Sequence, residues 1–189
     1  MIEAISSVAS AFGLSASAGL NAYLPLLVVG LMARFTDLIT LQEPWNALEN
    51  PWVLGVLAVL LAIEMTVDKF PIVDSINDTI QTFVRPVAGA VLFAASGNVI
   101  SDVHPALAMI CGLLVAGGVH VAKSTARPFV TGASIGAANP VVSVAEDVVS
   151  ATTSVLSIVV PILAAIVLLF LLAVLFWWIW RRARRRAWP

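Results

Sequence analysis

The sequence predicts an all-α fold, a polytopic bundle of transmembrane helices with about five spans and one further amphipathic or re-entrant helix. Of the 189 residues, 60% are hydrophobic and only 11% are charged, whereas soluble domains carry about 25% charged residues. The mean hydropathy is +1.01. Several uncharged segments approach the roughly 20 residues that cross the hydrocarbon core of a bilayer. We therefore expect residues 1–189 to form one transmembrane domain.

Four spans are expected before the C-terminal one. The second to fourth are shorter than 20 residues, so we expect neighbouring helices or polar flanks to complete them. The last span lies in an uncharged segment, Val148–Trp180, and is assigned as a helix over 151–180. An acidic residue near the start, in place of a basic one, argues against a cleavable signal peptide. The four earlier spans are Leu14–Phe35, Trp52–Val67, Val84–Ile100 and Pro105–Ala122.

The basic residues are unevenly distributed along the chain. The chain has ten Lys and Arg residues against eleven Asp and Glu residues, and half of the basic ones lie in a tail over 181–189. Tryptophans followed by arginines are typical of a cytoplasmic membrane interface, and such a cluster attracts anionic lipid headgroups. We therefore expect the C-terminus in the cytoplasm, and five spans then place the N-terminus outside. The lipid-binding residues are Arg181, Arg182, Arg184, Arg185 and Arg186.

The segment between Pro71 and Pro86 has helical periodicity, with apolar residues on one face and polar residues on the other. The polar face carries Asp74, Asp78 and Arg85. A helix of this length is too short and too polar to span a membrane. The pattern is compatible with a connector on the membrane surface and with a re-entrant segment.

Two polar clusters end apolar helices. The first contains Glu64, Asp68 and Lys69, and Glu64 lies within the hydrocarbon depth, where an ionisable residue indicates a functional site. The second contains His120, Lys123 and Arg127 at i, i+3 and i+7, on one helical face. Two interpretations follow if the clusters meet. They form either a solute or ion site or a structural network of ion pairs, and buried ion pairs contribute little net stability.

Two tracts rich in small residues surround Asn21 and Asn139. Ser15–Pro25 and Gly132–Pro140 each combine Ser, Gly, Asn and Pro. They are compatible with close helix packing or with broken helices whose ends face a solute, and Asn139 could cap a helix starting at Pro140. Similar glycine-to-proline spacings in Gly55–Pro71 and Gly112–Pro128 also suggest an internal repeat, assigned to 13–86 and 87–150.

Other chemistry has little support in the sequence. The single Cys111 excludes an intrachain disulfide and a cysteine-based metal site. No nucleotide-binding loop, nucleophile elbow or zinc-binding spacing occurs, so we expect no enzyme and no cofactor, and metal binding stays open. The arginine tail is too short and too close to the membrane to favour nucleic acid as a partner.

Four strings of sequence carry a family resemblance: "GLNAYLPLLVVGL", "DKFPIVDSINDTIQTFVRPVAGA", "HVAKSTARP" and "NPVVSVAEDVVS". Together they resemble the uncharacterised bacterial membrane protein family called domain of unknown function 4126, over roughly Phe12 to Ser150. The "DKFP…D…RP" string is the most specific part. The resemblance implies a small polytopic protein of the bacterial inner membrane. It implies no activity.

These patterns favour a small transporter or channel, with a polar site for an ion or small charged solute between repeat-like halves. Five spans enclose little volume, so we expect a homodimer or larger homo-oligomer. The first alternative is a scaffold or assembly factor whose charges neutralise each other. The second is an intramembrane enzyme acting on lipid phosphates.

Overall fold

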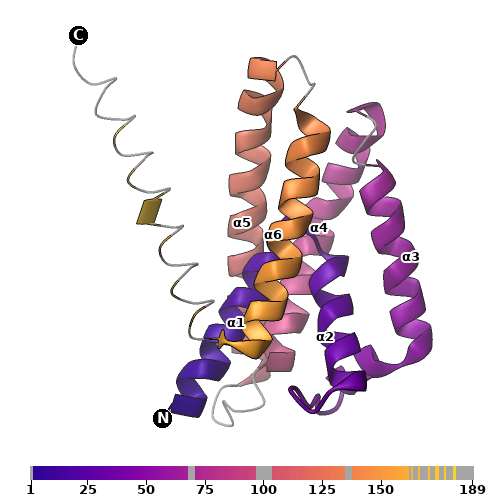
Figure 1. Ribbon diagram of the computed structural model, residues 1–189, viewed down its shortest axis with the longest axis vertical. Helices are drawn as coiled ribbons and strands as arrows, with labels where there is room; N and C mark the ends of the chain where they lie inside the picture. Colours follow the sequence, from indigo (N-terminus) through magenta and orange to yellow (C-terminus); the bar gives the residue numbers. More distant parts are fainter. Residues whose placement is uncertain are drawn as a thin grey trace.

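The computed structural model describes residues 2–67, 71–96, 104–134 and 138–161, with scattered positions after 161. In these ranges the fold is all-α and contains no strand, which confirms the predicted class. The helices pack side by side as a bundle (Figure 1). They are α1 (Ile2–Leu20), α2 (Tyr23–Phe35), the 3₁₀ helix η1 (Trp45–Glu49), α3 (Pro51–Val67), α4 (Pro71–Ser96), α5 (Pro105–Ser134) and α6 (Asn139–Val159).

Helix α1 is the central element of the bundle, and it packs against α4, α5 and α6. Its second half is buried almost all round because it consists largely of Ala, Ser and Gly, which let neighbouring backbones approach closely. At Gly19, an added Cβ would lie 2.5 Å from the carbonyl oxygen of Ala116 on α5. Helix packing through small residues therefore accounts for the Ser15–Gly19 tract.

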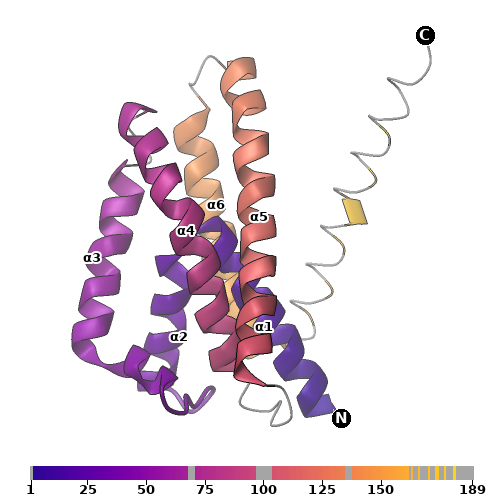
Figure 2. The ribbon, with the colours of Figure 1, turned by 180° about the vertical axis from the view of Figure 1, so that it is seen from behind.

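The first predicted span, Leu14–Phe35, is wrong. Helix α1 ends at Leu20, and α2 begins at Tyr23 and returns toward the end of the bundle where the chain starts (Figure 1). The two helices form a hairpin whose tip, Leu20–Ala22, lies part-way along the bundle instead of at its far end (Figure 2). Close helix packing and a broken helix are the alternative interpretations of the sequence tract around Asn21. The structure contains both.

The separate amphipathic helix expected between Pro71 and Pro86, either a surface connector or a re-entrant segment, is also wrong. Helix α4 runs continuously from Pro71 to Ser96 and contains Pro86 in its interior. Proline cannot donate to the carbonyl four residues earlier, yet the helix continues because α1 and α5 pack against it. The segment predicted as a separate amphipathic helix is therefore the first half of a 26-residue helix.

Two of the described helices are long and apolar enough to cross a membrane by length and composition, namely Pro105–Gly132 within α5 and all of α6. The expectation of five spans is not confirmed. Three further apolar helices, within α1, α2 and α3, are shorter. Helix α6 ends at Val159, so the helix predicted over 151–180 is interrupted at Val160, and most later residues lie outside the described part of the chain.

The outward faces of the bundle are apolar. Helix α3 buries Leu54, Leu57 and Glu64 on one face and exposes Trp52, with an exposed fraction of 84%, on another. Large exposed hydrophobic side chains also cover the outer faces of α5 and α6. Exposed apolar side chains in this number are typical of a surface that contacts lipid or another protein. The polar residues are concentrated inside, as expected for helices surrounded by lipid.

Candidate functional site

Ionisable side chains from four helices meet where the hairpin of α1 and α2 ends. We call this group the charged layer. Arg85 and His120 lie near the middle of α4 and α5, so the layer lies deep within the bundle. Its members are Glu64 on α3, Arg85 on α4, His120, Lys123 and Arg127 on α5, and Glu146 and Asp147 on α6, with Asn21 at the hairpin tip.

Arg85 is at the centre of the first part of the layer. Its Nη2 lies 3.0 Å from Oε1 of Glu64, and the two side chains are 0% and 1% exposed. Gln81 lies one turn away and is buried too. Within the described residues, Arg85 Nε and Gln81 Oε1 have no hydrogen-bond partner. The Tyr23 side chain on α2 interacts with Gln81 and with the charges of Glu64 and Arg85.

The geometry around His120 determines its tautomer. His120 Nδ1 lies 3.1 Å from Arg85 Nη1, and Nε2 lies 3.1 Å from Thr82 Oγ1. A guanidinium has donors only, so Nδ1 must be the acceptor and the proton is on Nε2. His120 is therefore neutral in this arrangement, and the Nε2–H group donates to Thr82.

Lys123 and Arg127 form the second part of the layer. Lys123 Nζ lies 2.9 Å from Glu146 Oε2, and Arg127 Nη2 lies 3.4 Å from the same oxygen. Lys123 also donates to the carbonyl oxygen of Leu20, at 3.0 Å. This carbonyl belongs to the last turn of α1, where helix carbonyls have no partner within the helix. The lysine thus links the hairpin tip to α5 and α6.

Asn21 holds the hairpin tip together with both ends of its side-chain amide. Its Oδ1 accepts from the backbone N–H groups of Tyr23 and Leu24, at 3.1 and 3.0 Å, and so caps the start of α2. Its Nδ2 donates to Asp147 Oδ1 at 2.9 Å. The sequence therefore singled out a residue that ties the broken helix to α6.

The structure describes the remaining predicted residues only in part. Asp68 and Lys69 lie outside the described residues, and for Asp74 and Asp78 only the helical backbone of α4 is described. Asn139 is the first residue of α6 and makes no cap, because its Oδ1 accepts from Thr131 Oγ1 at 3.0 Å. In the tail, Arg181 lies over the Trp177 ring at 4.8 Å, and Arg182, Arg184, Arg185 and Arg186 lie outside the described residues.

Sequence reasoning missed a row of hydroxyl groups between α1 and α6, which we call the serine seam. Ser10 donates to the Ser157 carbonyl at 2.5 Å, and Ser150 donates to the Ser17 carbonyl at 3.0 Å. The hydroxyls of Ser154 and Ser17 lie 2.9 Å apart. Spacings of three, four and seven residues place these serines on one face of each helix, a signal present in the sequence. The seam consists of Ser10, Ser17, Ser150, Ser154 and Ser157.

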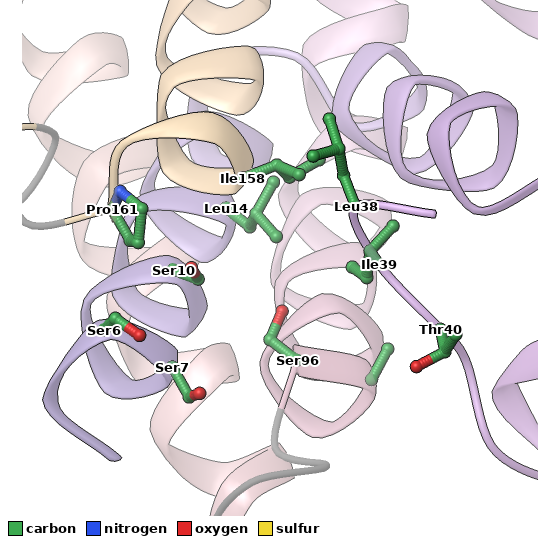
Figure 3. Close-up of a pocket in the computed structure, with 11 residues that line it drawn as sticks. Ser6, Ser7, Ser10, Leu14, Leu38, Ile39, Thr40, Ser96, Ile158 and Pro161 are labelled. Carbon is green, nitrogen blue, oxygen red and sulfur yellow. The ribbon is translucent and has the colours of Figure 1, made fainter. Parts of the chain in front are cut away.

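A pocket of about 230 Å³ opens at the end of the bundle where the chain begins. Figure 3 shows hydroxyl groups around it, contributed by α1, α4 and the segment that follows α2. The seam residue Ser10 and the buried Leu14 both belong to its wall. The residues that line it are Ser6, Ser7, Ser10, Leu14, Leu38, Ile39, Thr40, Ala95, Ser96, Ile158 and Pro161.

Metal chemistry finds little support in the described part of the chain, where no group of three or more His, Cys, Asp or Glu residues is placed to hold a metal ion. The charged layer offers different chemistry. Acids, bases, an imidazole and a backbone carbonyl lie within one largely buried region, and ionisable groups inside an apolar bundle are the usual mark of a functional site.

Comparison with known families agrees with the resemblance in the sequence. The sequence profile of "Domain of unknown function (DUF4126)" matches residues 8–182. The chain belongs to this family. The DUF4126 assignment covers the charged layer, the serine seam and the hairpin, and it brings no established activity with it. A search of curated proteins and a search of solved structures each find no match to the chain.

Proposed function

We propose that this DUF4126 protein moves an ion or small charged solute across the bacterial inner membrane through the charged layer. The observation that carries the proposal is that ionisable side chains from four helices meet deep in an apolar bundle. They meet at the tip of the hairpin that α1 and α2 form. Transporters commonly place their binding sites where helices are interrupted near the middle of the bilayer. The protein is then a multi-pass membrane protein with a cytoplasmic C-terminus.

The energetics of the layer support a functional role. Replacing a buried ion pair by apolar residues of similar volume often leaves a protein equally stable or more stable. Glu64 and Arg85 are both fully buried, so stability alone gives little reason for this pair. A charged side chain within the membrane is costly as well. A transport role would account for the buried charges, because acidic and basic side chains in turn could bind an ion as it passes.

The hairpin tip supports the same conclusion. Irregular backbone at membrane depth is tolerated only where it is buried in protein or lines a water-filled cavity. At this tip, Lys123 binds the Leu20 carbonyl and Asn21 binds Asp147. Both contacts are polar and reversible, so a charged guest can replace either one. A small bundle of this kind works as a homodimer or larger assembly, in which further helices complete the lipid-facing surface.

The test is a flux assay with the full chain in proteoliposomes. The probes are H⁺, Na⁺, Rb⁺ and Cl⁻, each driven by its own gradient. We expect flux of at least one probe above that of protein-free liposomes, and a loss of about tenfold or more in Glu64→Gln. Glu43→Gln is the matched control, because Glu43 is exposed in the loop after α2. Protein that is folded and correctly inserted but moves none of these ions would overturn the proposal.

One observation favours a second candidate, a scaffold that holds partner proteins in the membrane. Glu64 pairs with Arg85, and Glu146 pairs with both Lys123 and Arg127, as in a network that pins helices together. A charge reversal separates the two candidates. Glu64→Arg combined with Arg85→Glu restores the ion pair, so a scaffold regains its stability and its partners. A transporter regains stability but not flux, because the field along the path is reversed.

A further inference from the structure

The pocket beside α1 and the serine seam behind it lead toward the charged layer. Residues near the start of α1, the end of α4 and the segment after α2 line the pocket (Figure 3). Ser10 lines the pocket and contacts Ser157. Ser17, Ser150 and Ser154 continue deeper between α1 and α6. The backbone N–H of Asn21 donates to the Ser17 carbonyl at 3.1 Å. The serine seam therefore reaches the hairpin tip.

The chemistry of the pocket wall is rich in acceptors. Ser10 and Ser96 donate their hydroxyl hydrogens to the carbonyls of Ser157 and Leu92. A hydroxyl that donates its only hydrogen presents lone pairs to anything else that approaches. None of the described residues that line the pocket carries a charge. The wall therefore offers oxygen acceptors of the kind that coordinate small hard cations, without the carboxylates that divalent ions prefer.

Two helices, α4 and α6, end at the pocket. Ala95 and Ser96 are the last two residues of α4, and Ile158 lies next to the last residue of α6. The C-terminal ends of helices carry partial negative charge from carbonyls without intrahelical partners. The start of α1 lies at the same end of the bundle, and Pro161 in the pocket wall is helical again after the break at Val160. The preference for cations therefore rests on the oxygen acceptors of the wall, to which the carbonyls at the ends of α4 and α6 add.

We propose that this pocket is the entrance through which a small monovalent inorganic cation, Na⁺ or K⁺, reaches the charged layer along the serine seam. The inference rests on the proposed transport function and names its substrate class. The pocket, at about 230 Å³, holds several water molecules, so an ion enters it with part of its hydration shell. Leu14 is 0% exposed at the pocket wall, and it closes the route in this conformation.

Cysteine modification tests the entrance without relying on transport. The full chain carries Cys111→Ala and either Ser10→Cys in the pocket or Thr36→Cys as the control. Thr36 is exposed at the same end of the bundle and lies outside the pocket. Each variant is treated with a cationic and an anionic methanethiosulfonate reagent of similar size. Ser7→Cys, also in the pocket wall, replaces Ser10→Cys if that variant does not fold.

We expect the cationic reagent to react faster at Ser10→Cys by about tenfold or more, relative to the same ratio at Thr36→Cys, because oxygen acceptors in the pocket wall attract a cationic group and repel an anionic one. Added NaCl or KCl should slow the reaction more than N-methylglucamine chloride at equal ionic strength. Equal rates for the two reagents, a preference for the anionic one, or equal effects of the three salts would overturn the inference.

The two proposals fail in different ways. A cation-selective pocket in a protein that moves no ion would refute the transport function and leave the pocket as a cation-binding site. Cl⁻ flux combined with a pocket that has no preference for cations would refute this inference and leave transport intact. Na⁺ or Rb⁺ flux that falls when Ser10→Cys is modified supports both.

Discussion

Arg85 is the largest of the fully buried side chains in the described part of the chain. A guanidinium in that position must satisfy several N–H groups, and the structure supplies Glu64 on one side and His120 on the other. These partners come from α3 and α5, so one side chain links three helices. Removing it would take away the buried positive charge that pairs with the Glu64 carboxylate.

Loss of Arg85 should therefore destabilise the protein strongly. We expect Arg85→Leu to lower the free energy of unfolding by about 3–5 kcal/mol, the usual effect of breaking a buried pair, and the double variant Glu64→Leu/Arg85→Leu to lower it much less. Unfolding of the detergent-solubilised protein measures both. Arg34→Leu is the control, because Arg34 is exposed, donates to the Glu49 carbonyl and lies over the ring of the exposed Phe35. Equal losses in the single and double variants would contradict this account.

His120 should act as a neutral acceptor. His120→Leu leaves an Arg85 N–H group buried without its partner, which costs about 1–3 kcal/mol. His120→Asn can place its amide oxygen where Nδ1 lies, so we expect it to retain most of the stability. Thermal unfolding of the two variants side by side measures the difference. If Asn and Leu destabilise the protein equally, the contact between Arg85 and His120 is not a hydrogen bond to a neutral imidazole.

At the scale of elements, α4 and α5 approach each other closely. An added Cβ at Gly89 would lie 2.3 Å from the Ala116 Cβ and 2.8 Å from the Gly112 carbonyl oxygen. The approach brings Arg85 and His120 into contact, since both lie one turn from these positions on the same two helices. The contact between Arg85 and His120 thus depends on Gly89 and Gly112, which let α4 and α5 approach each other.

Gly89→Ala should therefore push the two helices apart. We expect a loss of about 1–3 kcal/mol in the free energy of unfolding, typical of overpacking, and reduced flux in the proteoliposome assay. Gly118→Ala on α5 is the control, since nothing lies within 4 Å of its added Cβ and alanine favours a helix by roughly 0.5–1 kcal/mol over glycine. A Gly89→Ala protein as stable as the wild type would show that the helices have room to separate.

The elements also show how far the sequence could predict the fold and the site. Apolar composition and periodicity predicted an all-α bundle, and polar spacing on helical faces singled out Glu64, Arg85, His120, Lys123 and Arg127. The break at Asn21 was missed as a boundary because the flanking residues are apolar on both sides. Pro86 predicted an end to a helix that continues, because packing against α1 and α5 outweighs the lost hydrogen bond. Periodicity cannot show which helices meet, so the Arg85–His120 contact needed the structure.

At the scale of the whole molecule, the two ends of the bundle differ in charge. Among the described residues, the end that carries the N-terminus and the connection from α2 to α3 (Figure 1) has one Arg, Arg34, and no Lys near it, and four acids, Glu3, Asp37, Glu43 and Glu49. Helix α6 ends on that same side with Val159. The uncharged sequence from there to Trp180 is about 20 residues long, enough to cross the bilayer core again, and five arginines follow it.

The distribution of basic residues therefore predicts the orientation of the bundle. Arginine-rich segments stay in the cytoplasm, so we expect the tail and the far end of α5 inside, and the N-terminus and the α2–α3 connection outside. Glu43→Cys and Gly132→Cys, each with Cys111→Ala, test this, since both positions are exposed and lie near opposite ends of the bundle. A membrane-impermeant maleimide applied to cells with a permeabilised outer membrane should label Glu43→Cys at once and Gly132→Cys only after the inner membrane is broken. The reverse pattern would place the pocket entrance on the cytoplasmic side and reverse the direction in which a cation enters the protein.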